Sequence, residues 1–326
     1  MPQNGCGIHP VWGSIFMDKM PLVAVVGPTA SGKTALAVAL AQRLGGEVVS
    51  ADSMQVYKYM NIGTAKPSYA EMCGIPHHVM DCILPDTEFN VAVFSKMAKD
   101  CIEKISMQGK MPILAGGTGM YIDNVLQNIK LAEMKTDYIL RKFFERTAEQ
   151  RGNEYLHRML SEVDMEAAMS IHPNNVKRVI RALEVFYLTG KTITDQKKDS
   201  KNEESPYNDI VFMPDWDRET LYKRIDMRVD NMINDGLVNE VKTLIRMGYT
   251  RELNSMQGIG YKEVFDYLEG LTSLEDTIDI IKRNSRRYAK RQLTWFNRHG
   301  SIIRLDPAGD MAEQAMVHIR EKFGIL

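Results

Sequence analysis

Short, mainly apolar runs alternate with helix-forming segments along the first part of the chain. The runs lie at residues 22–26, 47–51 and 111–115, and their length and composition predict strands buried on both faces. Residues 35–44 consist of good helix formers, and residues 91–107 carry one apolar stripe at helical spacing. Strands that are joined through helices lie parallel, with right-handed crossovers. The pattern therefore predicts an α/β core built on a parallel sheet that is flanked by helices.

The pattern changes near residue 136. Helical periods dominate from there to residue 188, which predicts a helical insertion. Residues 191–207 are polar and predict a mobile connection, and the apolar run at 209–213 predicts the return to the sheet. Residues 221–247 predict one helix, and Ser273 with Asp276 predicts the start of a last long helix. We expect an extension at 1–20, a first part of the core at 21–135, the insertion at 136–206, and a return to the core with basic helices at 207–326.

Composition narrows the class of protein. The 326 residues carry a formal net charge of −1, so any affinity for nucleic acid must come from a local patch. The four cysteines are scattered without a C-x-x-C pair, which favours reduced thiols. No apolar run approaches a membrane span, and residues 1–20 lack the features of a signal peptide. We expect a cytoplasmic monomer with no membrane partner.

The first predicted strand runs into a phosphate-binding motif. An octapeptide there matches G-x-x-x-x-G-K-[ST] in full: Gly27, Pro28, Thr29, Ala30, Ser31, Gly32, Lys33 and Thr34. Because a strand precedes the motif and a helix follows it, it predicts a P-loop in a P-loop NTPase-like core. Backbone N–H groups and Lys33 would bind phosphate oxygens, and Thr34 would hold Mg²⁺. The motif predicts a site for a di- or triphosphate and does not specify a nucleotide.

Two further polar turns follow predicted strands. Asp52 follows the second strand, and the sequence Gly116-Gly117-Thr118 follows the third. Since the carboxyl ends of parallel strands meet at one edge of a sheet, we expect both turns near the bound phosphate. The alternative for Asp52 is a cap on the next turn. His77 and His78 have no third ligand at useful spacing, so they predict structural or pocket-lining roles rather than a metal site.

The last long helix is strongly basic. Its cations fall in two adjacent stripes of i, i+4 spacing: Lys282, Arg283, Arg286, Arg287, Lys290 and Arg291. Like charges at this spacing repel one another unless an anionic group lies beside them. A solvated charged face is the ordinary alternative. We favour a surface for RNA or phosphate.

Taken in order, these motifs resemble those of the bacterial tRNA dimethylallyltransferase family. The resemblance covers residues 21 to about 300 and rests on several segments. They are the P-loop octapeptide, Asp52-Ser53 with Tyr57, residues 63–67, residues 76–78 with Asp81, residues 116–118 with Tyr121, and residues 181–184, 258–261 and 290–295. The resemblance implies transfer of a dimethylallyl group from dimethylallyl diphosphate to N6 of the adenosine just 3′ of the tRNA anticodon, with Mg²⁺ as cofactor.

The resemblance also assigns roles to residues. It makes Asp52 the general base, Thr118 a hydrogen-bond donor to the bridging oxygen, and Arg224 a ligand of the diphosphate, with Arg228 the second candidate. In this family the P-loop holds an isoprenoid diphosphate instead of ATP, which places the donor on Gly27, Thr29, Ala30, Ser31, Gly32, Lys33 and Thr34.

The family's tRNA contacts extend over much of the chain. They fall on Asp52, Ser53, Met54, Gln55, Thr118, Arg141, Lys177, Arg178, Arg181, Gln257, Gly258, Gly260, Tyr261, Lys262, Arg287, Lys290, Arg291 and Trp295. The target adenine must leave its stack to reach the site, so we expect the helical insertion and the core to grip the anticodon stem-loop between them.

Three other functions share some of these features. A small-metabolite kinase would also use a P-loop, and it would turn over ATP. An isopentenyltransferase that acts on free adenine nucleotides would not need the basic helix. A non-catalytic RNA-binding protein would need neither an intact P-loop nor Asp52.

Overall fold

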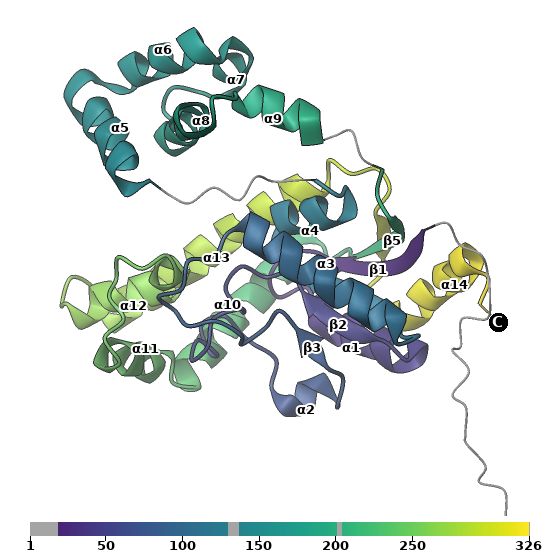
Figure 1. Cartoon of the computed structure of the whole chain (residues 1–326). Coiled ribbons are helices and arrows are strands. Elements are labelled where there is room, and N and C mark those ends of the chain that lie inside the picture. The colour runs from purple at the N-terminus through teal and green to yellow at the C-terminus, as the bar shows by residue number, and fades with distance from the viewer. Residues whose placement is uncertain (1–18, 130–136, 201–203, 326) are drawn as a thin grey trace, which may run out of the picture. The chain divides into compact units, whose positions relative to one another are not determined.

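The computed structural model describes residues 19–129, 137–200 and 204–325 (Figure 1). It divides into two compact units, one from Met1–Leu126 with Ser205–Leu326 and one from Gln127–Glu204. The sequence predicts the insertion at residues 136–206. The expected boundary at 135/136 and residues 1–18 of the expected extension lie outside the described residues.

The first unit is built on one parallel sheet of six strands, in the order β3-β2-β4-β1-β5-β6. The strands are β1 (Met20–Val26), β2 (Glu47–Ser50), β3 (His77–His78), β4 (Pro112–Gly116), β5 (Tyr207–Pro214) and β6 (Ile303–Leu305). The central strand β1 pairs in parallel with β4 and β5. The expected α/β fold is confirmed, whereas β3 and β6 were missed because runs of two and three residues show no period.

Helices cover both faces of the sheet. They are α1 (Lys33–Leu44), α2 (Tyr69–Met72), α3 (Val91–Met107), α4 (Gly119–Leu126), α10 (Arg218–Asn234), α11 (Leu237–Arg246), the 3₁₀ helix η1 (Ser255–Gln257), α12 (Tyr261–Leu268), α13 (Leu274–Phe296) and α14 (Met311–Phe323). None of the described helices is both long and apolar enough to cross a membrane.

The side chains of β1 point alternately into two separate hydrophobic cores. Val23 and Val25 point into the core shared with α1 and α14, which lie side by side in Figure 1. Leu22, Ala24 and Val26 point into the core shared with α3, α4 and the helices from α10 to α13. Successive side chains of a strand point to opposite faces, so each face of the central strand carries its own helical layer.

Two sequence predictions of secondary structure were wrong. The single helix expected over 221–247 is two helices, α10 and α11, because Gly236 adopts a φ of 101° between them. The connection expected over 191–207 includes α9 (Ile193–Ser200). Thr194 in α9 donates its backbone N–H and its hydroxyl to the buried carboxylate of Asp164, at 3.1 and 2.7 Å. That tertiary contact orders a segment whose composition alone indicates a loop.

The second unit is entirely helical where it is described. Its helices are α5 (Tyr138–Arg151), α6 (Asn153–Val163), α7 (Met165–Ser170), α8 (Val176–Thr189) and α9. They enclose a core of their own, which includes Phe144, Leu156, Leu160 and Leu183. A separate core of this kind is what a stable unit needs.

A buried ion pair ties α5 to α8 in the second unit. The side chain of Glu184 is 1% exposed, and both of its oxygens accept hydrogen bonds from the Arg141 guanidinium, at 2.7 and 3.0 Å. The Arg181 guanidinium lies 3.6 Å from the same carboxylate. Arg141, which the sequence analysis assigned to tRNA, therefore has a structural partner inside its own unit.

Replacing Arg141 by Ala should destabilise the protein. The change leaves the buried Glu184 carboxylate without its two charge-assisted hydrogen bonds. A hydrogen bond to a charged group contributes about 1.5–3 kcal/mol to the free energy of unfolding. Urea denaturation followed by circular dichroism measures the loss. Lys142→Ala, an exposed neighbour on the same helix, should stay within about 0.5 kcal/mol of the wild type. If Arg141→Ala weakens RNA binding at unchanged stability, the ion pair does not hold the unit together.

Candidate active site

The P-loop joins the end of β1 to the start of α1. Gly27 and Gly32 adopt φ values of 141° and 86°, which residues other than glycine rarely adopt. Ser31 is fully buried, and its hydroxyl has no hydrogen-bond partner among the described residues. An unpartnered buried hydroxyl is costly unless a ligand satisfies it, so this loop has the chemistry of a phosphate site.

Side chains from α10 and from the segment before it fix the backbone of the P-loop. The indole N–H of Trp216 donates to the carbonyl of Ser31 at 2.8 Å, and Arg224 Nε donates to the carbonyl of Ala30 at 2.8 Å. The Arg224 guanidinium also lies 4.4 Å from the centre of the Trp216 ring. These two bonds and the ring contact hold the backbone of the loop from one side.

Two cations and one carboxylate share the space beside the P-loop. Burial and, to a smaller extent, the nearby Arg228 lower the pKa of Lys33 to about 8, and Asp52 opposes both effects. Burial likewise lowers the pKa of Arg228, against the influence of Asp52 and Glu71. Arg228 and Asp52 both act on the pKa of Lys33, and Asp52 also acts on that of Arg228, so the structure brings these groups together. Buried cations with lowered pKa values mark a site that gains from an anion.

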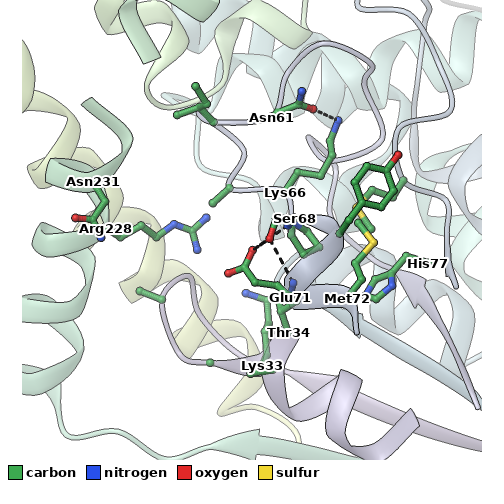
Figure 2. Close-up of a pocket in the computed structure, with 18 of the residues that line it drawn as sticks. Lys33, Thr34, Asn61, Lys66, Ser68, Glu71, Met72, His77, Arg228 and Asn231 are labelled. Carbon is green, nitrogen blue, oxygen red and sulfur yellow. Dashed lines mark hydrogen bonds between the residues drawn. The ribbon is translucent and has the colours of Figure 1, made fainter. Parts of the chain in front are cut away.

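A pocket of about 1240 Å³ opens beside these cations. Its wall includes Lys33, Thr34, Lys66 and both candidate arginines, Arg224 and Arg228. Figure 2 shows Arg228 extending from α10 toward the space above Lys33 and Thr34. The structure thus places both arginines at the phosphate end of the pocket.

The Asp52 turn and the Gly116–Thr118 turn meet at the same edge of the sheet. Thr118 donates its backbone N–H to the carbonyl of Ala51 at 3.3 Å, and its hydroxyl oxygen accepts from the Ser53 N–H at 3.2 Å. A Cβ atom on Gly116 would overlap the carbonyl of Ala51. Only glycine allows the two turns to approach so closely.

Asp52 also caps its own turn. Its Oδ1 accepts from the backbone N–H groups of Met54 and Gln55, at 2.9 and 3.4 Å, which is the alternative role that the sequence analysis considered. Its Oδ2 makes no hydrogen bond within the described part of the chain. The cap fixes the carboxylate and leaves one oxygen available as a proton acceptor.

Helix α13 packs three side chains against these turns, of which the sequence analysis identified only Trp295. Tyr288 is hydrogen-bonded to Thr118, and burial together with Asp52 raises its pKa to about 12. Gln292 accepts from the Thr29 N–H at 3.0 Å and donates to the carbonyl of Gly117 at 2.8 Å. Trp295 packs over Gly119 and donates its indole N–H to Asp123 at 2.8 Å.

Glu240 on α11 organises one wall of the pocket and was also missed. Its carboxylate accepts hydrogen bonds of 2.6–3.1 Å from the hydroxyl of Tyr261 and from the backbone N–H groups of residues 61–63. Tyr261 is 1% exposed, and Gly260 is also buried. The assignment of these two residues to tRNA stays a prediction, and the structure adds a supporting role for Tyr261 in this wall.

The remaining residues assigned to tRNA fall into two groups. The first group is exposed and comprises Lys177, Arg178 and Arg181 on α8 and Gln257, Arg287, Lys290 and Arg291 in the first unit. The second group is half-buried and comprises Ser53, Met54, Gln55, Thr118, Arg141, Gly258, Lys262 and Trp295. The cations of the first group lie at the surface, and one of them, Arg181, also lies 3.6 Å from Glu184.

Part of the basic helix has partners within the protein. Lys282 lies 2.6 Å from Asp230, and Arg286 pairs with Asp226, both on α10. These acidic residues neutralise one stretch of the helix. The cations that project from it at Arg287, Lys290 and Arg291 remain exposed, as an RNA surface requires.

No group of three or more His, Cys, Asp or Glu side chains in the described ranges could hold a metal ion. His78 pairs with Glu47 at 2.6 Å, and His77 lines the pocket, in agreement with the roles expected for them. Mg²⁺ in phosphate sites is commonly held by the phosphates, waters and one or two protein oxygens. The hydroxyl of Thr34, which lines the pocket, fits that mode of binding.

Comparisons with known proteins agree with one another. The tRNA dimethylallyltransferase of Acetivibrio thermocellus is 50% identical over 277 residues, which cover 85% of this chain and 88% of that protein. The one from Alkaliphilus oremlandii is 49% identical over 284 residues, which cover 87% of this chain and 90% of that protein.

Solved structures show the same likeness. The tRNA isopentenylpyrophosphate transferase of Bacillus halodurans has a TM-score of 0.70 at 45% identity, covering 94% of this chain and 97% of its own. A eukaryotic dimethylallyltransferase acting on tRNA has a TM-score of 0.79 at 31% identity, covering 93% of this chain and 79% of its own. A family model described as IPP transferase matches residues 55–299. The chain belongs to the IPP transferase family.

Proposed function

We propose that this protein transfers a dimethylallyl group from dimethylallyl diphosphate to N6 of the adenosine just 3′ of the anticodon of tRNA. The observation that carries the proposal is the meeting of the P-loop, Asp52 and Thr118 at one sheet edge in a chain of this family. The relatives named tRNA dimethylallyltransferase indicate the donor and the acceptor. They favour prenyl transfer over the phosphate transfer of a metabolite kinase.

The phosphate end of the pocket suits the leaving diphosphate. As the bond between the allylic carbon and oxygen breaks, negative charge grows on the diphosphate. Lys33, Arg224 and Arg228 line its site, and fixed cations of this kind stabilise the transition state more than the ground state. Mg²⁺ held by Thr34 and the phosphate oxygens would neutralise further charge on the leaving group. The hydroxyl of Thr118 can donate to the bridging oxygen.

Asp52 is suited to remove a proton from the acceptor amine. The N6 amine of adenine is a weak nucleophile, because its lone pair is delocalised into the ring, so a base that removes its proton assists the attack. The Oδ1 atom is held by two backbone N–H groups, which orients Oδ2 toward an incoming amine. A base flipped out of the anticodon loop can reach such a position.

The exposed cations supply the surface for tRNA. Arg287, Lys290 and Arg291 on α13 and Lys177, Arg178 and Arg181 on α8 are available to phosphates. Within the described residues, Cys73, Cys82 and Cys101 form no disulfide. Reduced thiols support action in the cytoplasm.

Asp52→Asn should slow the chemical step. The substitution keeps the shape of the cap but removes the base, and general-base catalysis typically contributes about 10²–10⁴-fold in rate. Single-turnover prenylation of an anticodon stem-loop measures the loss, and dimethylallyl diphosphate should still bind because Lys33 and Thr34 are intact. Asp215→Asn is a matched control, because Asp215 pairs with Arg304 at the surface. Transfer at the wild-type rate by Asp52→Asn would disprove the role of the base.

The affinity for the donor should fall at alkaline pH. Lys33, with its pKa near 8, is protonated below that pH, so binding there requires no proton uptake. Above it, binding a diphosphate must first restore the charge, and affinity falls by up to about tenfold per pH unit. Titration calorimetry in buffers of different ionisation enthalpy measures both effects. Lys33→Arg should remove the pH dependence, since arginine stays charged, and an unchanged pH dependence in that variant would exclude Lys33 as its source.

Removing one exposed cation of α13 should weaken RNA binding in a salt-dependent way. Arg287→Ala should lower the slope of log affinity against log salt by about one unit per lost phosphate contact. Arg286→Ala is the control on the same helix, since Arg286 is paired with Asp226 and its loss should leave the slope unchanged. Fluorescence anisotropy with a labelled stem-loop reports the slope. Equal slopes in Arg287→Ala and the wild type would make this a solvated surface.

A further inference from the structure

A single buried amide joins the P-loop to the Gly116–Thr118 turn. Gln292 on α13 is 6% exposed. Its Oε1 accepts from the Thr29 N–H at 3.0 Å, and its Nε2 donates to the Gly117 carbonyl at 2.8 Å. Thr29 belongs to the loop proposed for the donor diphosphate, and Gly117 directly precedes the proposed catalytic Thr118.

The position demands an amide. One partner is a donor and the other is an acceptor. A glutamine side chain offers both an acceptor and a donor at every pH, whereas glutamate does so only when it is protonated. Without the amide, two buried backbone groups would lose their partners. A Cβ atom on Gly117 would overlap Nε2 of Gln292. The close approach of Gly117 and the need for one donor and one acceptor therefore favour glutamine at position 292.

Gln292 is the middle member of a stripe on α13. Tyr288 precedes it by four residues and is hydrogen-bonded to Thr118, and Trp295 follows by three and packs on Gly119. Positions with this spacing lie on one face of a helix. The same helix exposes Arg287, Lys290 and Arg291. Helix α13 thus contacts the proposed donor site while it offers cations to RNA.

We propose that Gln292 is a positioning residue that holds the diphosphate loop and the Thr118 turn at a fixed separation. The inference rests on the proposed function. The donor binds one of these segments and the reacting centre lies at the other, so their separation sets the distance from the allylic carbon to the amine. A misplacement of about 1 Å can lower a rate by about a hundredfold.

The test compares two substitutions with a matched control. Gln292→Met keeps the length of the side chain and removes both hydrogen bonds. Gln292→Glu keeps an acceptor for Thr29 and removes the donor to Gly117. Gln314→Met is the control, because Gln314 on α14 makes the same pair of bonds, of 2.9 Å each, to the backbone of Asp306. Single-turnover transfer from dimethylallyl diphosphate to the stem-loop is measured together with RNA affinity and thermal midpoint.

We expect Gln292→Met to lose about a hundredfold in the single-turnover rate at saturating donor, with RNA affinity unchanged, while Gln314→Met keeps the wild-type rate. The rate of Gln292→Glu relative to the wild type should rise as the pH is lowered from about 8 to about 6, because a protonated carboxyl can donate to Gly117 again. If Gln292→Met does not fold, the pH profile of Gln292→Glu alone tests the inference. A relative rate that does not change with pH overturns it.

A rate for Gln292→Met within threefold of the wild type also overturns the inference. So does a loss of rate that Gln314→Met reproduces at an equal drop in thermal midpoint, because that loss would follow from stability alone. If the wild-type protein itself fails to prenylate the stem-loop, the proposed function fails instead. The two failures are therefore distinguishable.

Discussion

The site depends on the close approach of three backbone turns at the carboxyl ends of β1, β2 and β4. Gly116 and Gly117 have no room for a side chain, since a Cβ atom would overlap Ala51 in one case and Gln292 in the other. Parallel strands bring these turns to one edge. The glycines then let the turns touch, and the carbonyl of Ala51 accepts directly from the Thr118 N–H. The placement of Asp52 relative to the P-loop follows from this contact.

Among the described residues of the first unit, some cationic side chains form ion pairs with acidic side chains, and others do not. Lys282 and Arg286 have acidic partners on α10. Lys33 and Arg228 instead lie beside the P-loop near the carboxylates of Asp52 and Glu71, and burial lowers the pKa values of both cations. Cations that are removed from water favour an anionic ligand over a neutral one. Under the proposed function, these two cations therefore favour the diphosphate of the donor.

Local sequence was enough to predict the strand–loop–helix unit, the parallel sheet and the convergence of Asp52 with Thr118, because each follows from a short motif or from the geometry of parallel strands. The roles of Gln292 and Glu240 could not be predicted in this way, since their partners are distant in sequence and show no periodicity. The bond from Tyr261 to Glu240 could not be predicted either, because a glycine-rich turn does not reveal which way its neighbour points. One signal was available for Gln292: it is a neutral residue in a strongly basic helix, at helical spacing from Trp295.

The order of the strands has a consequence for synthesis on the ribosome. The P-loop is made early, yet one of the two strands beside β1 is β5 (Tyr207–Pro214), and the amide that holds the loop belongs to residue 292. The helical unit at 127–204, with a core of its own, is translated completely before β5 exists. Chains grow at about 5–20 residues per second, and domains generally fold as units. The inserted unit can therefore fold while the sheet is still missing a central strand, and the phosphate loop acquires its final shape only when nearly the whole chain has emerged.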